Sequence, residues 1–258
     1  MTDLQNAVIL ITGAGGGFGR EMTKQFSSAG SKLILSDYDV SNIEPQINIL
    51  TCYQADLSSR DGCESLFEQV KADNFSPDIL INNAGIARYG RFDELPDEEW
   101  ESVININLLA PMRLCHLFMP EMIARKSGHI INISSMAGWA GIKGDAAYST
   151  AKYGLRGFGE SIYAELKPHN VHVTTVYPFF SRTPILEIKS FGSLKPPGLP
   201  DNLITNPEDV IAEVINGIRK NKQHVFPDNY AKMIVWMKRF APWTLNLLNR
   251  RIERQTRQ

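Results

Sequence analysis

Short apolar runs alternate along the chain with longer stretches in which apolar residues recur at helical spacing. The runs are bounded by turn residues and predict buried strands at Ala7–Thr12, Lys32–Ser36, Ile49–Tyr53, Asp78–Asn82, His129–Ser134, Val171–Tyr177 and a short His224–Phe226. The stretches with helical spacing predict helices at Gly17–Ala29, Arg60–Ala72, Glu98–Arg125 and Ala146–Lys167. Strands that alternate with helices in this way pair in parallel, and right-handed crossovers place helices on both faces of the sheet.

The pattern therefore predicts an α/β fold: a three-layer, Rossmann-like, doubly wound parallel sheet of about seven strands. We expect a single domain over residues 1–258 with a C-terminal helical extension, because no repeat or low-complexity linker divides the chain. Within it, residues 7–183 are expected to form the core, 184–206 a substrate loop, and 207–258 a helix, a short strand and a basic helical tail. The Pro- and Gly-rich stretch Phe191–Asn206 predicts a mobile loop.

Composition narrows the classes of function. Hydrophobic residues make up 43% of the chain and charged residues 21%, as in ordinary globular proteins, and the net charge of -1 gives no reason to expect a nucleic-acid partner. Three widely spaced cysteines predict no disulfide framework, and the scattered His116, His129, His169 and His172 predict no metal site. The N-terminus lacks the features of a signal peptide, and no uninterrupted apolar run approaches the ~18 residues of a membrane span, so we expect a cytoplasmic protein.

A glycine-rich turn follows the first predicted strand and opens a helix, with the sequence Thr12-Gly13-Ala14-Gly15-Gly16-Gly17-Phe18-Gly19. Glycines let the backbone approach a ligand closely, and a helix start offers unpaired N–H groups that suit a pyrophosphate. The fingerprint G-x-G-x-x-G is not strictly met, because Phe18 stands where the third glycine would fall, whereas T-G-x-x-x-G-x-G is met in full. The turn predicts a dinucleotide site that includes Gly13, Gly17, Phe18 and Gly19.

Asp37 ends the second predicted strand, at the distance from the glycine turn where dinucleotide-binding folds place an acidic residue. A carboxylate there accepts hydrogen bonds from both ribose hydroxyls of the adenosine half, and it would repel a 2′-phosphate. Its neighbours are Tyr38 and Asp39 rather than Arg or Lys. The sequence therefore favours NAD(H) over NADP(H).

Tyr148 and Lys152 form a Y-x-x-x-K pattern in a predicted helix, where positions four apart lie on one face. A free tyrosine has a pKa of about 10 and is a poor base at neutral pH, but a neighbouring cation lowers that pKa. Tyr148 is then able to exchange a proton with an alcohol or carbonyl oxygen while hydride moves to or from a nicotinamide. The pattern by itself is common by chance, so its meaning depends on the motifs around it.

These motifs, in this order, resemble the short-chain dehydrogenases/reductases over roughly Ala7 to Thr183. The resemblance implies that Ser135, thirteen residues before Tyr148, holds the substrate oxygen and stabilises the charge that develops there. It also implies that Asn107 holds a water that relays protons past the lysine. Ser134 is expected to pack beside Ser135, although an exchange of their roles stays open.

The resemblance implies further contacts with the cofactor. Asp56 and Leu57 follow the third predicted strand and are placed to touch the adenine, and the segment Asn82-Asn83-Ala84-Gly85 matches the family's N-N-A-G. Of this segment, Asn83, Ala84 and Gly85 are expected to line the cofactor. Tyr148 and Lys152 are expected to contact the nicotinamide half, with Lys152 on its ribose.

One segment departs from the family. After the sixth predicted strand Pro178 and Thr183 fit the family pattern, in which the Thr contacts the nicotinamide amide, but Phe179 replaces the usual glycine. We expect its ring to narrow the floor under the nicotinamide or to make the substrate pocket more apolar.

The end of the chain is basic. Residues 219–258 contain ten Lys or Arg and two Asp or Glu. The spacing predicts a helix with one apolar side, formed by Tyr230, Met233, Ile234, Met237 and Ala241. Pro242 and Trp243 interrupt this pattern. Apolar residues then recur at Leu245, Leu247, Leu248 and Ile252, together with the arginines Arg250, Arg251, Arg254 and Arg257. The plainer interpretation is a helix pair that packs on the core or on another subunit. The alternative is a membrane-surface element or a lid over a lipid-like substrate, because basic amphipathic helices with Trp suit anionic interfaces.

Together these features predict an NAD(H)-dependent alcohol dehydrogenase or carbonyl reductase that acts on CH–OH groups of a hydrophobic (steroid-, retinoid- or acyl-like) substrate. The pocket is expected within Phe179–Asn206, where apolar side chains dominate: Phe179, Phe180, Ile185, Leu186, Phe191 and Leu194. Two alternatives stay open, an NADPH-dependent carbonyl reductase and a catalytically silent dinucleotide-binding protein. By analogy with the family we expect a homodimer or homotetramer, and peripheral membrane contact through the tail stays open.

Overall fold

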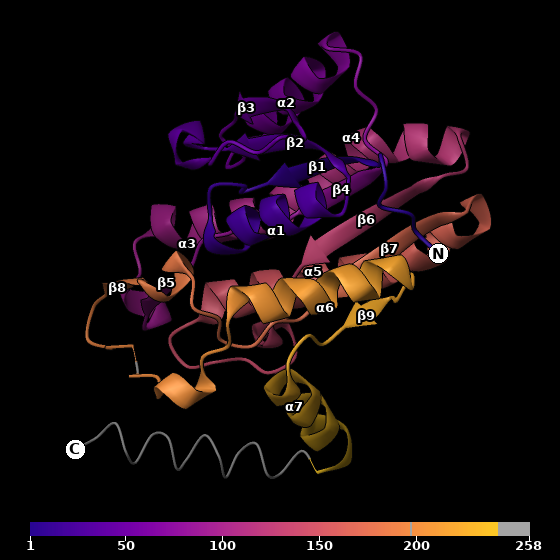
Figure 1. Ribbon diagram of the computed structural model, residues 1–258. Helices are drawn as coiled ribbons and strands as arrows, with labels where there is room; N and C mark the ends of the chain where they lie inside the picture. Colours follow the sequence, from indigo (N-terminus) through magenta and orange to yellow (C-terminus); the bar gives the residue numbers. More distant parts are fainter. Residues whose placement is uncertain (197, 242–258) are drawn as a thin grey trace.

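The computed structural model describes residues 1–196 and 198–241. Its main sheet has seven strands, all paired in parallel, in the spatial order β3 (Ile49–Gln54), β2 (Lys32–Asp37), β1 (Val8–Thr12), β4 (Ile79–Asn82), β6 (Gly128–Ile133), β7 (Val171–Val176) and β9 (His224–Val225). Each predicted strand agrees with the observed one to within one residue at each end. The predicted doubly wound parallel sheet is confirmed (Figure 1).

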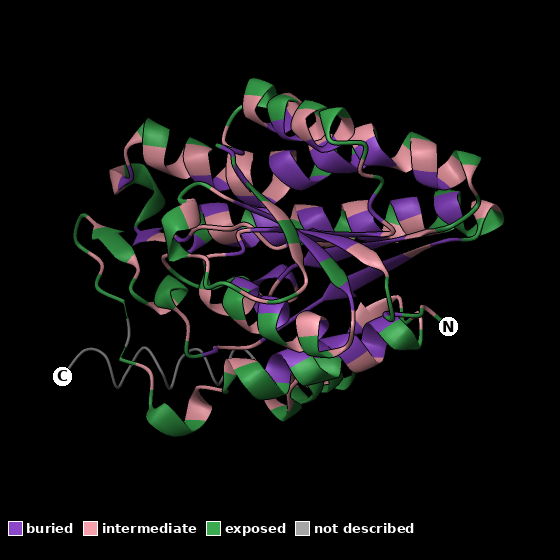
Figure 2. Ribbon diagram, turned by 45° about the horizontal axis from the view of Figure 1, so that its top comes forward, coloured by how far each residue is buried: buried purple, intermediate pink, exposed green. Residues whose placement is uncertain are grey.

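Helices cover both faces of this sheet, which gives three layers (Figures 1 and 2). One face packs against α1 (Gly17–Ser28) and α6 (Pro207–Arg219). The other face packs against α2 (Arg60–Ala72), α4 (Ala110–Ala124) and α5 (Ala146–Leu166). Figure 2 shows the strands as the buried layer between the helices.

Alternation along the strands feeds two separate hydrophobic clusters. In β1, Ile9 and Ile11 belong to the cluster under α1 and α6, whereas Leu10 belongs to the cluster under α2, α4 and α5. Strands buried on both faces read as continuous apolar runs, which is why periodicity along the sequence located them so well. Phe26 of α1 and Phe118 of α4 are among the largest fully buried side chains on the two sides.

The predicted helix Glu98–Arg125 corresponds to one continuous helical run, Asp97–Ala124, whose hydrogen bonding changes in the middle. The structure has α3 (Asp97–Ile104), a π-helical segment Asn105–Leu109, and then α4. Within the described residues, the whole run Asp97–Ala124 is the one helix long and apolar enough to cross a membrane by length and composition, and 39% of its most apolar window is buried inside the protein. The core helix of a soluble protein passes the same test.

A second, two-stranded parallel sheet was not predicted. It pairs β5 (Arg88–Gly90) with β8 (Lys189–Phe191), so Phe191 lies opposite Gly90 at the end of a strand and not at the start of a loop. The remaining regular elements include short 3-10 turns at Val40–Asn42, Phe92–Glu94, Met136–Gly138, Lys167–His169, Pro184–Leu186 and Asp201–Leu203.

The last described element is α7 (Asn229–Phe240), which lies beyond the edge of the sheet near β9 (Figure 1). Ala231 and Ile234 pack in a small cluster with Met136 and Tyr177, whereas Met233 is 47% exposed. The predicted apolar side of this helix is therefore packed at Ile234 and exposed at Met233. The predicted apolar and basic positions from Pro242 to Arg257 lie outside the described residues.

Candidate active site

A cavity of about 1540 Å³ opens at the carboxyl ends of the central strands. It lies where the strand order changes direction between β1 and β4, the place where doubly wound sheets bind their ligands. The predicted site residues that line it are Gly13, Gly17, Phe18, Asp37, Asp56, Leu57, Asn83, Ala84, Gly85, Ser135, Tyr148, Lys152, Pro178 and Thr183. Gly19 and Asn107 are not among the lining residues and lie behind them.

Close packing explains the glycines of the turn after β1. Gly13 has a φ of +65°, and a methyl group on it would come within 2.7 Å of Ala84 Cα. A methyl group on Gly19 would come within 2.1 Å of the Gly13 carbonyl oxygen, so Gly19 allows the turn to fold back onto α1. Its expected contact with a cofactor stays a prediction. The Asn83 amide donates to the carbonyl oxygens of Thr12 (3.0 Å) and Gly13 (2.9 Å) and fixes the turn beside β4.

The start of α1 is open to an anion. Its first residue is Gly17, and the capping residue Gly16 has no side chain that could accept from the first N–H groups. At the end of β2, the Asp37 carboxylate accepts from the Gly15 N–H (2.8 Å) and from the Asp39 N–H (3.2 Å). The backbone N–H groups at the start of α1 therefore suit a pyrophosphate, and the Asp37 carboxylate beside them suits the ribose of an adenosine.

Tyr148 and Lys152 face each other across one turn of α5. The Lys152 Nζ lies 5.5 Å from the centre of the Tyr148 ring and donates to the Ile133 carbonyl oxygen at the end of β6 (2.8 Å). Lys152 is buried, whereas Tyr148 is half-buried at the cavity wall. An ammonium carries three donors, so Lys152 keeps donors for a further partner in the cavity.

Ser135 stands opposite this pair, directly after β6. Its Oγ accepts from the Ala137 N–H (3.1 Å), which fixes the serine at the start of a 3-10 turn. The Tyr148 phenol lies near enough to Ser135 for the serine hydroxyl to lower its pKa. The neighbouring Ser134 Oγ donates to the Lys152 carbonyl oxygen (3.0 Å), so Ser134 ties β6 to the backbone of α5.

Burial dominates the ionisation of the two catalytic candidates. Burial raises the pKa of Tyr148 to about 12, while the Ser135 hydroxyl lowers it and the charge of Asp145 raises it. Burial lowers the pKa of Lys152 to about 7. The expectation that Lys152 lowers the pKa of Tyr148 is wrong for the protein by itself, because burial outweighs the attraction of an amine that loses its own charge near neutral pH.

Asn107 lies in the π-helical segment, fully buried behind the cavity wall. Its amide donates to the carbonyl oxygens of Ile86 (2.8 Å) and Val103 (2.9 Å), while Asn107 Oδ1 is buried without a partner in the described part of the chain. A methyl group on Gly85 would stand 2.6 Å from that oxygen and 3.7 Å from Lys152 Nζ. The glycine therefore leaves a small space bounded by an acceptor and a donor, which suits a bridging water.

Phe179 packs against aromatic residues at the cavity wall. Its ring packs 4.7 Å from the ring of Phe180 and 5.4 Å from that of Tyr230 in α7, and its N–H donates to Asp228 (3.0 Å). It also lines the cavity. The ring therefore joins the cavity wall to α7.

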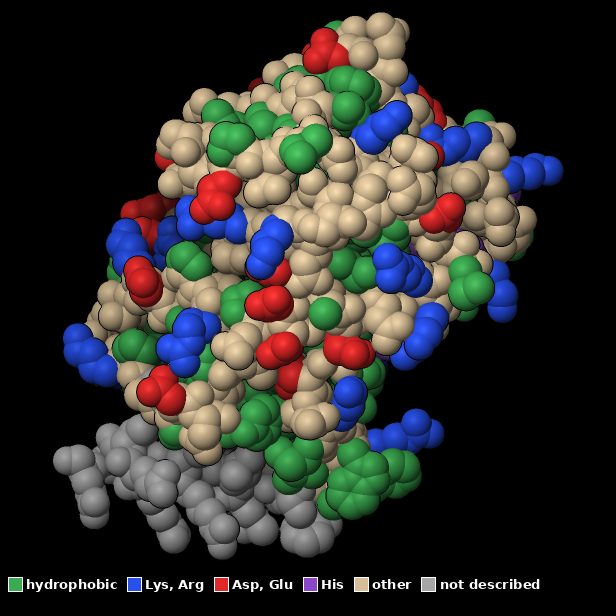
Figure 3. All heavy atoms as spheres, viewed as in Figure 1, with side chains coloured by type: hydrophobic (Ala, Val, Ile, Leu, Met, Phe, Trp, Pro, Cys, Tyr) green, Lys and Arg blue, Asp and Glu red, His purple; other side chains and the backbone are tan. Residues whose placement is uncertain are grey.

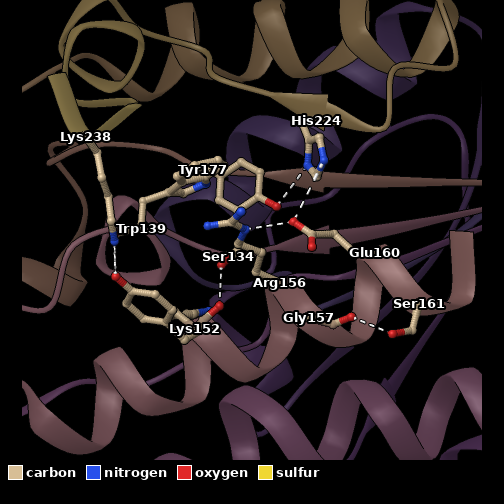
Figure 4. A network of polar contacts seen from close by, with 11 residues as sticks. Ser134, Trp139, Lys152, Arg156, Gly157, Glu160, Ser161, Tyr177, His224 and Lys238 are labelled. Atoms are coloured by element: carbon tan, nitrogen blue, oxygen red, sulfur yellow. Dashed lines mark hydrogen bonds and ion pairs between the residues drawn. The ribbon is translucent and has the colours of Figure 1, made fainter. Parts of the chain in front are cut away.

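A polar network holds the far side of the catalytic helix, as Figure 4 shows. The Arg156 guanidinium stacks 3.4 Å over the Trp139 ring and bonds to Glu160 (2.8 Å). Glu160 lies 4.0 Å from His224 Nε2, and His224 Nδ1 bonds to the Tyr177 hydroxyl (3.0 Å). These contacts tie α5 to β7 and β9, so the face that carries the phenol and the amine keeps its position.

The same network reaches α7. Lys238 donates to the Tyr153 hydroxyl (2.6 Å) and to the Trp139 carbonyl oxygen, and Tyr153 donates to that carbonyl as well. Trp139 closely follows Ser135 in the chain, so α7 is attached to the segment that presents the serine (Figure 4).

The histidines lie elsewhere, since none of the described histidines lines the cavity. His129 is buried between the hydroxyls of Thr2 (2.9 Å) and Thr174 (2.8 Å), and burial lowers its pKa to about 3. Within the described residues, no group of three or more His, Cys, Asp or Glu could hold a metal ion.

Comparison with known proteins agrees with this geometry. The family described as short chain dehydrogenase matches residues 7–190, which is most of the chain and includes the glycine turn, Ser135, Tyr148 and Lys152. The chain belongs to the short-chain dehydrogenase family. It is accordingly a short-chain dehydrogenase that acts on CH–OH groups.

Individual relatives bind different forms of nicotinamide dinucleotide. Epidermal retinol dehydrogenase 2 of Homo sapiens is 32% identical over 252 residues, which cover 93% of this chain and 80% of the relative. A 4-hydroxyisoleucine dehydrogenase complexed with NADH is 26% identical, with a TM-score of 0.75, over 86% of this chain and 96% of that one. A metagenomic short-chain oxidoreductase in complex with NADP is 30% identical, with a TM-score of 0.68, over 87% and 98%.

Sequence reasoning missed part of this short-chain dehydrogenase's cavity wall. Ile86, Ala87, Arg88 and Tyr89 line it from β5 and the segment before it, and Asp145 lines it just before Tyr148. The acid three residues before Tyr148 was a usable signal, because a charge so near a tyrosine affects its pKa. The strand pairing of β5 left no comparable signal.

Proposed function

We propose that this short-chain dehydrogenase interconverts an alcohol and a carbonyl on a hydrophobic substrate, with NAD(H) as the hydride carrier and Tyr148 as the acid/base. One observation carries the proposal: Ser135, Tyr148 and Lys152 meet in a cavity whose other end is the glycine turn with Asp37. The same cavity can thus hold a dinucleotide and a substrate against one set of polar groups. Its volume of about 1540 Å³ exceeds that of an ordinary small-molecule pocket, roughly 300–1,000 Å³.

The cofactor fits the residues of this chain at both ends. The N–H groups at the start of α1 suit the pyrophosphate, Asp37 the adenosine ribose, and the donors of Lys152 the nicotinamide ribose. Asp56 and Leu57 are proposed to border the adenine, and Thr183 lies beside Gly17 at the start of α1, next to the proposed pyrophosphate position. When bound, the nicotinamide ring supplies or accepts the hydride.

The chain's own groups handle the proton. Ser135 orients the substrate oxygen and stabilises the charge that develops on it, while the Tyr148 hydroxyl gives that oxygen a proton or takes one from it. The raised pKa keeps Tyr148 protonated at neutral pH, which suits donation to a carbonyl. Lys152, with a pKa near neutrality, and the space between it and Asn107 provide a route for the proton to be replaced.

NAD(H) rather than NADP(H) is proposed because the Asp37 carboxylate already bonds the Gly15 N–H beside the glycine turn. A 2′-phosphate at the same ribose would place negative charge next to it. Relatives that bind NADH and relatives that bind NADP are both similar to this chain, so an NADPH-dependent reductase is the alternative. Exposed Arg20 also lines the cavity and is the cation that such a reductase would use.

We therefore expect wild-type enzyme to show a higher kcat/KM with NADH than with NADPH. The Asp37→Ala variant should reduce that preference by about 10- to 100-fold, because it removes a like charge from the phosphate position. Steady-state kinetics with both cofactors on a panel of ketones measures this. A wild type that prefers NADPH contradicts the assignment, and absence of turnover with either cofactor favours a catalytically silent binding protein.

A hydrophobic substrate is proposed from the side chains around the outer part of the cavity. Phe179, Phe180, Ile185, Leu186 and Leu194 line it, and Ile234 of α7 joins them. Phe191, which was expected here, pairs in β8 instead and is not among the lining residues. A human relative at 32% identity is a retinol dehydrogenase, which agrees with an apolar alcohol but does not identify it.

Peripheral attachment to an anionic membrane surface is proposed for α7. Met233 (47% exposed), Trp236 (61%) and Phe240 (64%) recur at spacings of three and four residues and form one exposed apolar stripe. Hydrophobic side chains gather over α7 at the lower end of the molecule in Figure 3. Lys232 and Arg239 are exposed beside the stripe, and α7 contains no Asp or Glu, so its charge complements anionic lipid. Because Ile234 lines the cavity, an apolar substrate could enter from this side.

Flotation with phosphatidylserine-containing vesicles tests this attachment. We expect wild-type protein to float with the vesicles, and to float less at high salt. Trp236→Glu should weaken binding by about 10-fold, because it removes an apolar contact with the lipid and adds repulsion from the anionic headgroups. Ile47→Glu, at a 99% exposed position in another part of the chain, is the matched control and should bind as wild type does. Equal binding by wild type and Trp236→Glu, or none by wild type, contradicts the proposal.

A cytoplasmic location and a homodimer or homotetramer stay proposals. Cell fractionation can test the location, and sedimentation can test the oligomeric state.

A further inference from the structure

Asp145 is a buried acid that no structural role explains. It caps the N-terminus of α5, three residues before Tyr148, and is only 8% exposed. Its side chain makes no capping hydrogen bond to the helix, and Asp145 Oδ1 is buried without a hydrogen-bond partner in residues 1–196 and 198–241. Its backbone N–H and carbonyl, by contrast, bond to Ile142 (3.1 Å) and Ser149 (2.7 Å).

An acceptor in this state lowers the stability of the protein. Buried polar groups in native proteins nearly always have a partner, and those that lack one tend to act on ligands or in catalysis. Burial also raises the pKa of Asp145 to about 7, so its ionised form is poorly stabilised by the protein. A hydrogen-bond donor brought by a ligand would satisfy the carboxyl.

The position of Asp145 is in the substrate part of the cavity. It lines the cavity together with Tyr89 and Ile142, three residues before Tyr148 in the chain. Burial is the main cause of the raised pKa of both Tyr89 and Tyr148, and the charge of Asp145 raises both further. The Asp145 carboxyl therefore lies near both phenols. The neighbouring Gly144 fits tightly, since a methyl group on it would come within 2.4 Å of the Tyr89 ring.

Of the other charged side chains that line the cavity, Lys143, Glu187 and Lys195 are exposed. Arg88 and Lys189 both bond to Glu99, which ties β5 and β8 to α3. Most of the remaining wall is apolar. Asp145 is therefore a buried carboxyl in a mostly apolar wall, next to the residue that exchanges the proton.

We propose that Asp145 determines substrate specificity: its carboxyl binds a hydrogen-bond donor, a hydroxyl or an ammonium, that the apolar substrate carries near its reacting carbon. The inference rests on the proposed oxidoreductase function and adds a substrate class to it, an apolar molecule with a second polar group. The pKa of about 7 means that Asp145 is mainly a carboxylate only above neutral pH, and a carboxylate accepts but does not donate. Above that pH the second group must therefore carry a hydrogen, and a ketone or ether oxygen at that place would be rejected.

A ligand series tests this. A medium-chain ketone is compared with derivatives in which one hydroxyl, or one amine, is moved along the chain a carbon at a time. Affinity for the NADH-loaded enzyme is measured by the change in NADH fluorescence, and kcat/KM is measured in parallel. We expect wild type to prefer the best hydroxyl or amine derivative over the parent ketone by about 10- to 100-fold, the usual effect of a hydrogen bond to a charged group.

Two substitutions and a control separate the charge from the fold. Asp145→Leu should abolish the preference and bind the parent ketone at least as well as wild type does, and Asp145→Asn should lose the preference for the amine series more than for the hydroxyl series. Glu165→Leu removes an exposed carboxylate from the same helix, outside the cavity, and should leave the preference unchanged. Thermal unfolding checks that each variant folds.

The outcomes are distinct. Equal affinities of wild type for the parent and for every derivative, or a preference that survives Asp145→Leu, overturn the role of Asp145. Because affinity is measured without turnover, a clear preference with no turnover on any member supports the Asp145 site and counts against the proposed chemistry. Failure of the wild-type protein to bind NADH would contradict the proposed function directly.

Discussion

Replacement of Tyr148 by Phe is expected to lower kcat by about 10²- to 10⁴-fold, the usual contribution of a positioned acid/base, with little change in NADH affinity. The ring stays in the cavity wall and only the phenol oxygen is lost, so the variant can no longer exchange a proton with the substrate oxygen. Lys152 keeps its bond to the Ile133 carbonyl, so the cofactor end should be unaffected. Steady-state kinetics and a fluorescence titration with NADH measure the two effects.

The matched control for this variant is Tyr153→Phe. It removes a phenol from the same helix, but that phenol bonds to Trp139 and Lys238 and does not line the cavity. We expect Tyr153→Phe to alter stability more than kcat. If Tyr148→Phe turns over as wild type does, or if both variants lose activity equally, Tyr148 is not the acid/base.

Ser135→Ala is expected to lower kcat by about 10²- to 10³-fold, as removal of one donor to a developing oxyanion does. KM should change less, because the serine acts mainly on charge that develops in the transition state. The variant also loses the bond from Ala137, which is local to one 3-10 turn. Comparison of kcat and KM for wild type and variant tests the role.

Ser134→Ala is the control that decides between the two serines. Ser134 bonds the Lys152 carbonyl, so its loss should lower the melting temperature and reduce kcat only mildly. The reverse ranking, with Ser134→Ala almost inactive and Ser135→Ala nearly normal, would show that the two serines exchange the roles assigned to them here.

The strands and the catalytic spacing could be predicted because both depend on local pattern. Strands buried on both faces, such as β1 and β6, are continuous apolar runs between turn residues, and their ends were placed to within one residue. Tyr148 and Lys152 lie one helical turn apart in any helix, so sequence alone placed them on one face. The turn after β1 was equally local.

Features that depend on distant contacts could not be predicted. The three-residue strands β5 and β8 pair across about a hundred residues of sequence, and neither run is distinctive. The π-helical segment frees the Val103 carbonyl for the Asn107 amide, which a helical pattern does not reveal. The split of α7 into a packed side and an exposed stripe depends on where β7, β9 and Trp139 lie.

Electrostatic balance was also out of reach of the sequence. The spacing of Tyr148 and Lys152 suggested that the lysine charge stabilises the ionised tyrosine. The depth of the two groups in the protein decides the outcome instead, because burial raises the pKa of Tyr148 and lowers that of Lys152. Asp145 was overlooked for the same reason, because its burial and its lack of a partner appear only when α5 and β5 are placed together.

The proposed catalysis depends on one arrangement, in which Ser135 and Tyr148 both contact the substrate oxygen while Lys152 holds the cofactor. A crystal structure with NADH and an unreactive substrate analogue measures it most directly. We expect the Tyr148 hydroxyl and the Ser135 Oγ to lie within hydrogen-bonding distance of one ligand oxygen, and Lys152 Nζ to bond the nicotinamide ribose. A phenol turned away from the ligand, or a ligand oxygen beyond the reach of both hydroxyls, would contradict the account.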